Sequence, residues 1–361
     1  MASSAIHTAA HGFRPVRLTL ARELRALTKS DLAARIERTP SAITQFEGGH
    51  VRPDAHTLKS IALALGLPVE FFSADVSTAL IPLDACHFRS LRSASQRQRR
   101  QLLAQAALLG DLVGLLEHEV EFPPERVSEA SQVASVEDIE TSATSVRRAW
   151  GLGLGPIPNL TKLLENKGVL VMRIERSIRE VDAFSFWHRG RPCIFLIMEK
   201  QSSSRTRWDA GHELGHLVMH ADAIPGSPEM ERAANRFAGA FLLPREPFLS
   251  ECPRRLNWPH FFELKARWGV SVAALVRRAR DLGCLSEATY RRACIVLRQK
   301  GPREKGEPPM ENPRLIAEAL KVVRTDLPIE SVASSLSLSA ADLFDLLALS
   351  DEDRTLLSGT A

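Results

Sequence analysis

The most constraining feature of the sequence is a five-residue motif, His212-Glu213-Leu214-Gly215-His216. Two histidines four residues apart project from the same face of an α-helix, so both imidazole rings can reach one metal ion. With 11 histidines among 361 residues, a chance occurrence is rare. Glu213 lies one step round the helix, where its carboxylate can act as a general base on water. The motif therefore predicts a helix that binds Zn²⁺. The plainer alternative is a pair of surface or capping histidines.

A catalytic zinc site needs a third protein ligand. His220 lies a full turn further along the same helix, and we interpret it as a packing or supporting residue. Asp222 would require the chain to turn back at Met219, whose bulky side chain disfavours positive φ. We therefore expect Glu231 as the third ligand and Asn235, four residues later, as the hydrogen-bond partner of a ligand histidine. The alternative for Glu231 is an ordinary surface carboxylate.

Near the N-terminus the pattern predicts two short helices joined by a tight turn. Thr28 is a plausible N-cap for the first helix, and Thr39 followed by Pro40 starts the second, which Gly48-Gly49 ends. Ala33 and Ile43 are placed to bury the helix crossing. The unit is therefore expected to be a helix-turn-helix.

The exposed front of the second helix carries short and amide side chains, which can contact base edges in a major groove. The flanking cations are expected to contact phosphates. The candidate DNA-binding residues are Thr39, Ser41, Ala42, Thr44 and Gln45 on the helix, with Lys29, Arg38 and Arg52 beside it. The alternative is a structural bundle that binds protein.

The length favours two or three domains, and 44% hydrophobic with 25% charged residues excludes a disordered or collagenous chain. We expect a mainly α fold with a small β-sheet, whose strands span 169–174, 183–187 and 193–198. An all-α helix-turn-helix bundle precedes an α+β HExxH domain and C-terminal helices. The predicted segments are a disordered N-terminus 1–13, a helix-turn-helix domain 14–75, a basic connector with helices 76–150, a peptidase domain 151–300, a linker 301–313 and a helical segment 314–361. No internal repeat is found.

Charge and cysteine usage indicate the setting. Residues 1–109 carry 14 Lys+Arg and 8 Asp+Glu, while the whole chain is only +4, so an anionic partner is expected for the front half. The alternative is a solvated basic surface. Five isolated cysteines argue against a disulfide framework, which favours a reducing compartment. We expect no signal peptide and no membrane-spanning segment, and hence a cytoplasmic protein.

Residues 17–72 resemble the Cro/repressor-type (XRE) helix-turn-helix family. The matching residues are Leu32-Ala33, Pro40-Ser41-Ala42-Ile43, Phe46-Glu47-Gly48-Gly49, Arg52-Pro53 and Leu58-Lys59-Ser60-Ile61-Ala62. The resemblance implies binding of a double-stranded DNA operator, usually as a homodimer.

The chain from about Cys86 to Pro313 resembles the ImmA/IrrE family of metallopeptidases. The residues that carry this are Phe88-Arg89-Ser90-Leu91-Arg92, Trp150-Gly151-Leu152-Gly153, Pro156-Ile157-Pro158-Asn159-Leu160, Glu165-Asn166-Lys167-Gly168-Val169, Asp182, Arg191-Pro192, His212–His216, Glu231–Pro244, Lys265, Trp268-Gly269-Val270-Ser271 and Arg278-Ala279. The resemblance implies a gluzincin-like site, with His212, His216 and Glu231 on zinc and Glu213 as base. It also implies a repressor or antitoxin as substrate, in stress or mobile-element regulation. Gly211 and Ala233 depart from the family's usual residues, and 314–361 lies outside the resemblance.

Three hypotheses follow. The first is a zinc endopeptidase targeted by its own DNA-binding domain. The second is an XRE-type regulator whose peptidase-like domain senses a ligand without proteolysis, because regulation at a promoter needs no cleavage. The third is an antitoxin that acts only through protein contacts.

Overall fold

The structure is a computed structural model, and it describes residues 2–74, 81, 95–130, 135–174, 182–197, 202–220, 227–300, 304–349 and 351–358. These residues form two compact units. One holds the described residues of Met1–Ala85, Leu91–Phe122 and Ile316–Ala361, and the other those of Pro123–Leu315. The domain boundaries expected from the sequence stay predictions.

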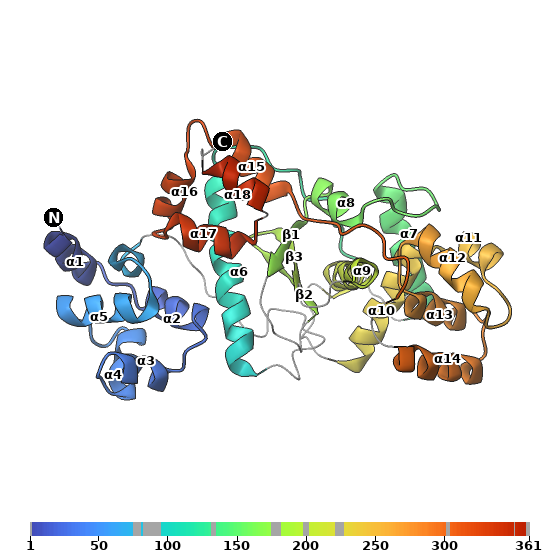
Figure 1. Cartoon of the computed structure of the whole chain (residues 1–361), viewed down its shortest axis with the longest axis horizontal. Coiled ribbons are helices and arrows are strands. Elements are labelled where there is room, and N and C mark those ends of the chain that lie inside the picture. The colour runs from blue at the N-terminus through green and yellow to red at the C-terminus, as the bar shows by residue number, and fades with distance from the viewer. Residues whose placement is uncertain are drawn as a thin grey trace. The chain divides into compact units, whose positions relative to one another are not determined.

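The first unit is all helical (Figure 1). Its elements are α1 (Ala2–His11), α2 (Pro15–Leu24), α3 (Lys29–Arg35), α4 (Pro40–Glu47), α5 (Ala55–Leu65), the 3₁₀ turn η1 (Val69–Phe72), α6 (Gln96–Leu116), α15 (Leu315–Val323), α16 (Ile329–Ser335), α17 (Ala340–Leu347) and α18 (Asp351–Leu357).

The second unit contains the sheet and the remaining helices. Its elements are α7 (Val136–Ala149), α8 (Leu160–Asn166), β1 (Leu170–Ile174), β2 (Ala183–His188), β3 (Arg191–Ile197), α9 (Ser203–Met219), α10 (Pro228–Leu242), α11 (Arg245–Glu251), α12 (Trp258–Trp268), α13 (Val272–Asp281) and α14 (Glu287–Lys300). The predicted fold class, mainly α with a small sheet, is confirmed.

The N-terminal segment differs from its prediction. Residues 1–13 were expected to be disordered, but Ala2–His11 is helical. Ala9 and Phe13 are buried, and α1 packs against α5 and η1. The Arg52 guanidinium also donates to the carbonyl of His11 at 3.0 Å, at the C-terminal end of the helix. Apolar burial and this cap therefore order a segment whose small, polar composition gave no such signal.

The helix-turn-helix forms as predicted. The Thr28 hydroxyl accepts from the Asp31 amide, and the Thr39 hydroxyl accepts from the Ala42 amide, so both helices carry side-chain N-caps. Ala33 and Ile43 are fully buried where α3 and α4 cross.

The sheet of the second unit has the order β1-β3-β2, with β1 parallel and β2 antiparallel to β3 (Figure 1). Phe184 and Phe186 stack on Phe195, so these aromatic side chains share one face of the sheet. Since side chains alternate along a strand, Ser185 lies on the opposite face, towards α9. The three predicted strands are confirmed to within one residue at most ends.

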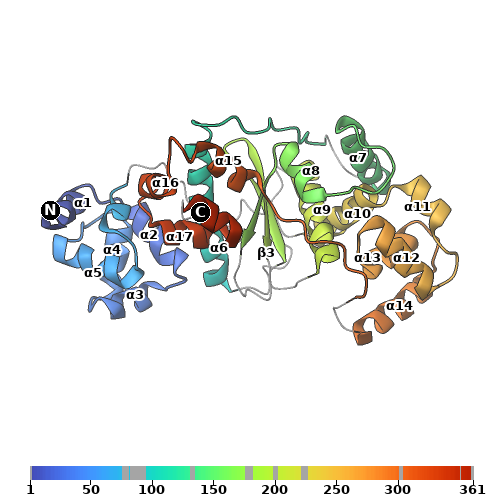
Figure 2. The same ribbon diagram turned by 45° about the horizontal axis from the view of Figure 1, so that its top comes forward.

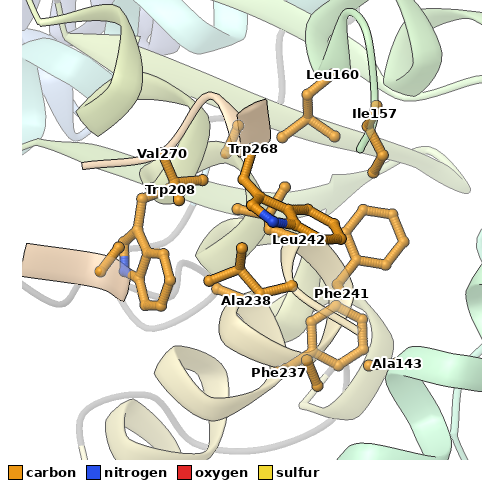
Figure 3. Close-up of a cluster of buried hydrophobic side chains, with 14 of the residues drawn as sticks. Ala143, Ile157, Leu160, Trp208, Phe237, Ala238, Phe241, Leu242, Trp268 and Val270 are labelled. Carbon is orange, nitrogen blue, oxygen red and sulfur yellow. The ribbon is translucent and has the colours of Figure 1, made fainter. Parts of the chain in front are cut away.

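Two glycines let α9 and α10 approach closely. A Cβ at Gly215 would lie 3.1 Å from the Phe237 ring, and one at Gly211 would lie 3.2 Å from Leu242. Such contacts are tighter than most side chains tolerate, so the small residues set the helix spacing. Phe237 and Leu242 belong to the buried cluster of this unit, together with Trp208 of α9 (Figure 3). Close packing against Leu242 thus explains why position 211 has glycine, where the resembling family usually has another residue.

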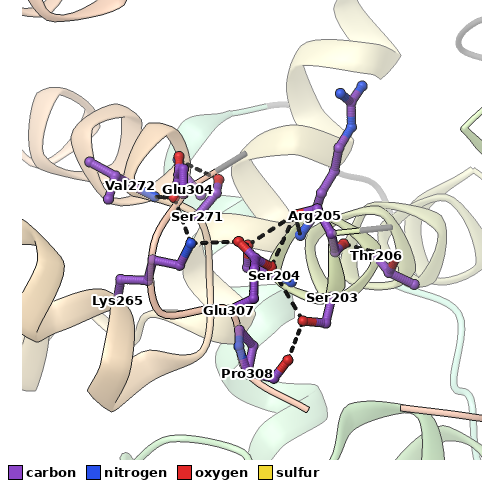
Figure 4. A network of polar contacts seen from close by, with 12 residues as sticks. Ser203, Ser204, Arg205, Thr206, Lys265, Ser271, Val272, Glu304, Glu307 and Pro308 are labelled. Atoms are coloured by element: carbon purple, nitrogen blue, oxygen red, sulfur yellow. Dashed lines mark hydrogen bonds and ion pairs between the residues drawn. The ribbon is translucent and has the colours of Figure 1, made fainter. Parts of the chain in front are cut away.

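Residues 304–315 lie along the second unit and supply carboxylates to helix N-termini. Glu304 accepts from the Val272 amide at 2.9 Å, Glu307 from the Ser204 amide at 3.0 Å, and both bind the buried Lys265 ammonium (Figure 4). Glu311 accepts from the amides of Leu160 and Thr161 and pairs with Arg207. This segment therefore anchors the start of α9, although most of it was expected to be a linker. Among the described helices, none is long and apolar enough to cross a membrane.

Candidate functional site

The two motif histidines and Glu231 converge between α9 and α10. The Nε2 atoms of His212 and His216 are 3.1 Å apart, and the Glu231 carboxylate oxygens lie 3.3 Å and 3.4 Å from them. Both histidines are buried, whereas the Glu231 side chain keeps 20% of its exposure. In the described part of the chain this is the group of His, Cys, Asp and Glu side chains placed to hold a metal ion.

The spacing fits zinc. Ligand bonds of about 2.0–2.1 Å in a tetrahedron put neighbouring donor atoms about 3.3 Å apart. The 3.1 Å between the two Nε2 atoms is close to such an edge, and each ring nitrogen lies within 3.4 Å of a different oxygen of the Glu231 carboxylate. Two imidazoles and one carboxylate also make a catalytic donor set, which leaves the fourth position open.

The two histidines also affect the ionisation of Glu231. Burial by itself raises the pKa of the Glu231 carboxyl, but hydrogen bonds and charge from His212 and His216 lower the pKa well below its usual value. Glu231 is therefore ionised, as a metal ligand must be.

Glu213 is held by a residue that the sequence did not single out. The Ser185 hydroxyl on β2 donates to Oε2 of Glu213 at 2.7 Å, and both residues are buried. The only local signal was a small polar residue between two phenylalanines of an apolar strand. Ser185 orients the carboxylate expected to act as base.

His220 contacts the candidate centre indirectly, through the ring of His216. Its Nδ1 lies 3.1 Å from Nδ1 of His216, and which nitrogen donates depends on the tautomers. The supporting role expected for His220 thus takes the form of a hydrogen bond that orients the His216 ring. Asp222, the alternative ligand, lies outside the described residues.

Asn235 faces the same helix pair. Its amide donates to the Glu231 carbonyl at 2.6 Å, and its oxygen accepts from Arg277 at 2.7 Å and from the Trp208 indole at 3.4 Å. Asn235 therefore fastens the Glu231 turn to α9. A hydrogen bond from Asn235 to a ligand histidine stays a prediction.

The helix α4 presents the expected reading face. Ser41, Thr44 and Gln45 are exposed, and Ala42 is half-buried. The Thr39 hydroxyl instead caps the helix by accepting from the Ala42 amide, and the Thr44 hydroxyl donates to the Pro40 carbonyl at 3.0 Å. Ser41 and Gln45 are thus the side chains best placed to meet base edges.

The three flanking cations make contacts within the chain. Lys29 donates to the Thr44 hydroxyl at 3.3 Å, and Arg38 donates to the Thr57 hydroxyl at 3.1 Å. Arg52 binds the His11 carbonyl. Arg38 and Arg52 remain exposed, so their charge is still available to phosphates.

Two family models match the chain. The IrrE N-terminal-like domain, of the M78 peptidases, matches residues 164–280, and a helix-turn-helix model matches residues 18–72. The first range contains all four residues of the candidate centre, and the second contains the candidate DNA-binding residues. A search of curated proteins finds no match. The chain therefore combines a repressor-type helix-turn-helix DNA-binding domain with an IrrE N-terminal-like peptidase domain.

Proposed function

We propose that the protein is a zinc-dependent endopeptidase guided by its own operator-binding domain. The observation that carries this proposal is the trio of His212, His216 and Glu231, grouped so that it could hold a metal ion, beside a buried glutamate held by Ser185. The peptidase family of the surrounding domain supports it.

The chemistry divides between metal and protein. A zinc ion bound by the trio supplies a Lewis acid that polarises oxygen in its open position. The Glu213 carboxylate takes a proton from attacking water and returns it to the leaving nitrogen. Ser185 restrains Glu213 through Oε2, so the base keeps one orientation in both transfers.

An extended peptide has a strand on which to align. In the described sheet β2 pairs only with β3, so its other edge has no strand partner there. An added peptide strand can hydrogen-bond to such an edge. Because Ser185 of β2 touches Glu213, a peptide aligned on this strand lies beside the base.

The substrate class follows from the fused DNA-binding domain. A helix-turn-helix brings the peptidase to a promoter, where the proteins within reach are DNA-bound repressors and antitoxins. We propose such a protein as the substrate, in stress or mobile-element regulation. Operator binding as a homodimer and a cytoplasmic location belong to the same proposal.

The test is scission of a repressor encoded beside the chain's own gene. Purified protein with measured zinc content is incubated with that repressor, with and without a chelator, and fragments are identified by mass spectrometry. Cleavage that stops with the chelator supports the proposal. A zinc-loaded protein that leaves every neighbouring repressor intact refutes it and favours a transcriptional regulator whose peptidase-like domain is a ligand sensor.

A further inference from the structure

The C-terminal helices repeat the geometry of the helix-turn-helix. Helix α3 spans Lys29–Arg35 and α4 spans Pro40–Glu47, while α16 spans Ile329–Ser335 and α17 spans Ala340–Leu347. Each pair thus joins a seven-residue helix to an eight-residue helix through the same number of residues, 300 positions apart. We call residues 329–347 the C-terminal motif.

The two turns agree residue by residue. Glu37 has φ 53° and Ser337 has φ 55°, so each turn places a non-glycine residue in the left-handed region. Arg38 donates its amide to the Ala33 carbonyl at 2.9 Å, and Leu338 to the Ala333 carbonyl at 2.8 Å. Such strained, matching positions mark one turn type.

The caps agree as well. The Thr39 hydroxyl accepts from the amide three residues on at 3.2 Å, and the Ser339 hydroxyl does so at 3.1 Å. Five buried positions correspond, namely Leu32 and Val332, Ala33 and Ala333, Ile36 and Leu336, Ile43 and Leu343, and Phe46 and Leu346. Ile329 and Leu338 are buried as well, whereas their counterparts Lys29 and Arg38 are not. Between 28–49 and 328–349, Ala33 and Ala333 are the only identical pair. The sequence therefore carries no repeat, and the correspondence lies in the backbone and the caps.

The side chains that would read DNA are different in the C-terminal motif. Where α4 has Ser41 and Gln45, α17 has Ala341 and Asp345. The stretch 325–353 contains no lysine or arginine but seven acidic residues. The motif therefore offers no cation to a phosphate, so it lacks the contacts on which DNA affinity depends.

The turn of the C-terminal motif instead meets a buried arginine of α2. Arg17 is fully buried, and it donates to the Leu336 carbonyl at 3.2 Å and to the Phe71 carbonyl at 2.9 Å. Its guanidinium lies over the Phe71 ring and 3.9 Å from the Asp111 carboxylate of α6. A buried guanidinium is costly unless its donors are bound, so the Leu336 carbonyl supports the core of the first unit.

The second helix of the motif continues this contact. Asp342 of α17 pairs with Arg25 at 3.2 Å, and the same guanidinium donates to the Leu65 carbonyl at 2.7 Å. Helix α17 also packs on α6, which both views show side by side (Figures 1 and 2). The position that corresponds to Ala42 of α4 thus contacts protein.

We infer that residues 329–347 are a second helix-turn-helix motif that binds protein and not DNA, and that its partner is the first helix-turn-helix domain of the same chain. The motif braces α2 through Arg17 and Arg25. The DNA-binding domain is therefore assembled from both ends of the sequence.

A core substitution tests the brace in the full-length protein. Val332→Asp places a charge in the buried centre of the motif, and Val322→Asp is the control, because Val322 is 68% exposed. Hydrogen exchange of the amides in residues 15–24 should accelerate about 5- to 30-fold in Val332→Asp alone. Hydrogen exchange in residues 228–242, which belong to the second unit, serves as an internal control and should not change. Unchanged exchange in 15–24, with 329–347 unprotected, overturns the inference.

Because Val332→Asp could disrupt the whole first unit, a surface pair provides a second test. Gln45→Asp and Asp345→Gln exchange the corresponding residues of the two motifs. The measured quantity is operator affinity, which rests on the proposed function, whereas the hydrogen-exchange test does not. Gln45→Asp should weaken operator affinity about 5- to 150-fold. Asp345→Gln should leave operator affinity within about twofold of the wild-type value. Equal losses would show that the C-terminal motif reads DNA. No operator binding by wild type would contradict only the proposed function.

Discussion

At the candidate metal centre, the Nε2 atoms of His212 and His216 lie 3.1 Å apart, and each has an oxygen of the Glu231 carboxylate within 3.4 Å. On α4, by contrast, Ser41 and Gln45 are exposed to solvent, and the neighbouring Arg38 and Arg52 contact groups of the chain itself. The first site consists of mostly buried side chains held by their neighbours, whereas the second consists of exposed side chains. Substitutions should therefore have steep effects at the centre and graded effects on the DNA face.

The largest expected effect is on zinc binding. Glu231→Ala removes one of three ligands and should lower zinc affinity more than about 100-fold, beyond the range of supporting residues. Asp222→Ala is the control and should leave zinc affinity nearly unchanged. Titration of both variants against a zinc-buffering chelator measures this. Full zinc retention in Glu231→Ala would remove Glu231 from the ligand set.

Supporting residues should give an intermediate loss. His220→Ala removes the group beside Nδ1 of His216, and Asn235→Ala releases the Glu231 turn from Trp208 and Arg277. Each should lower zinc affinity about 10- to 100-fold. The same titration applies, and losses as large as that of Glu231→Ala would mean that one of them is itself a ligand.

Substitution of a residue that is expected to contact a base should have a smaller effect on DNA binding than loss of a ligand has on zinc binding. Gln45→Ala should lose about 1–3 kcal/mol on the cognate operator and relax sequence choice. Operator and random duplexes are compared by fluorescence anisotropy at physiological salt. Wild-type protein that binds both equally would exclude specific readout by this helix.

A phosphate contact should have the smallest effect. Arg52→Ala should weaken binding to all sequences alike and reduce the slope of log affinity against log salt by about 1. Since Arg52 also caps α1 through the His11 carbonyl, the exchange of α1 amides serves as a control for folding. An unchanged salt slope would assign Arg52 a structural role only.

Local spacing explains what the sequence predicted well. The two histidines and the Thr39 cap are recognised by short-range rules that need no tertiary structure, because helix periodicity and capping are local. The three strands were predicted for the same reason, since each is a short apolar run between turn residues.

Contacts between distant segments explain what the sequence did not predict. Ser185 meets Glu213 across 28 positions, and Glu307 caps α9 from 103 positions away. The C-terminal motif shares one identical residue with its counterpart, so only its backbone angles and burial pattern reveal it. The N-terminal helix was missed because its stability comes from packing against α5 and η1.

The most direct test of the account is a comparison of wild type with Glu213→Gln on the same repressor, with zinc measured in each sample. The substitution removes the base and leaves the three ligands, so both proteins should carry equal zinc, and only wild type should cleave. A loss of about 10²–10⁴ in rate is expected. Cleavage by Glu213→Gln at the wild-type rate would contradict the assignment of Glu213 as base, and with it the proposed peptidase mechanism.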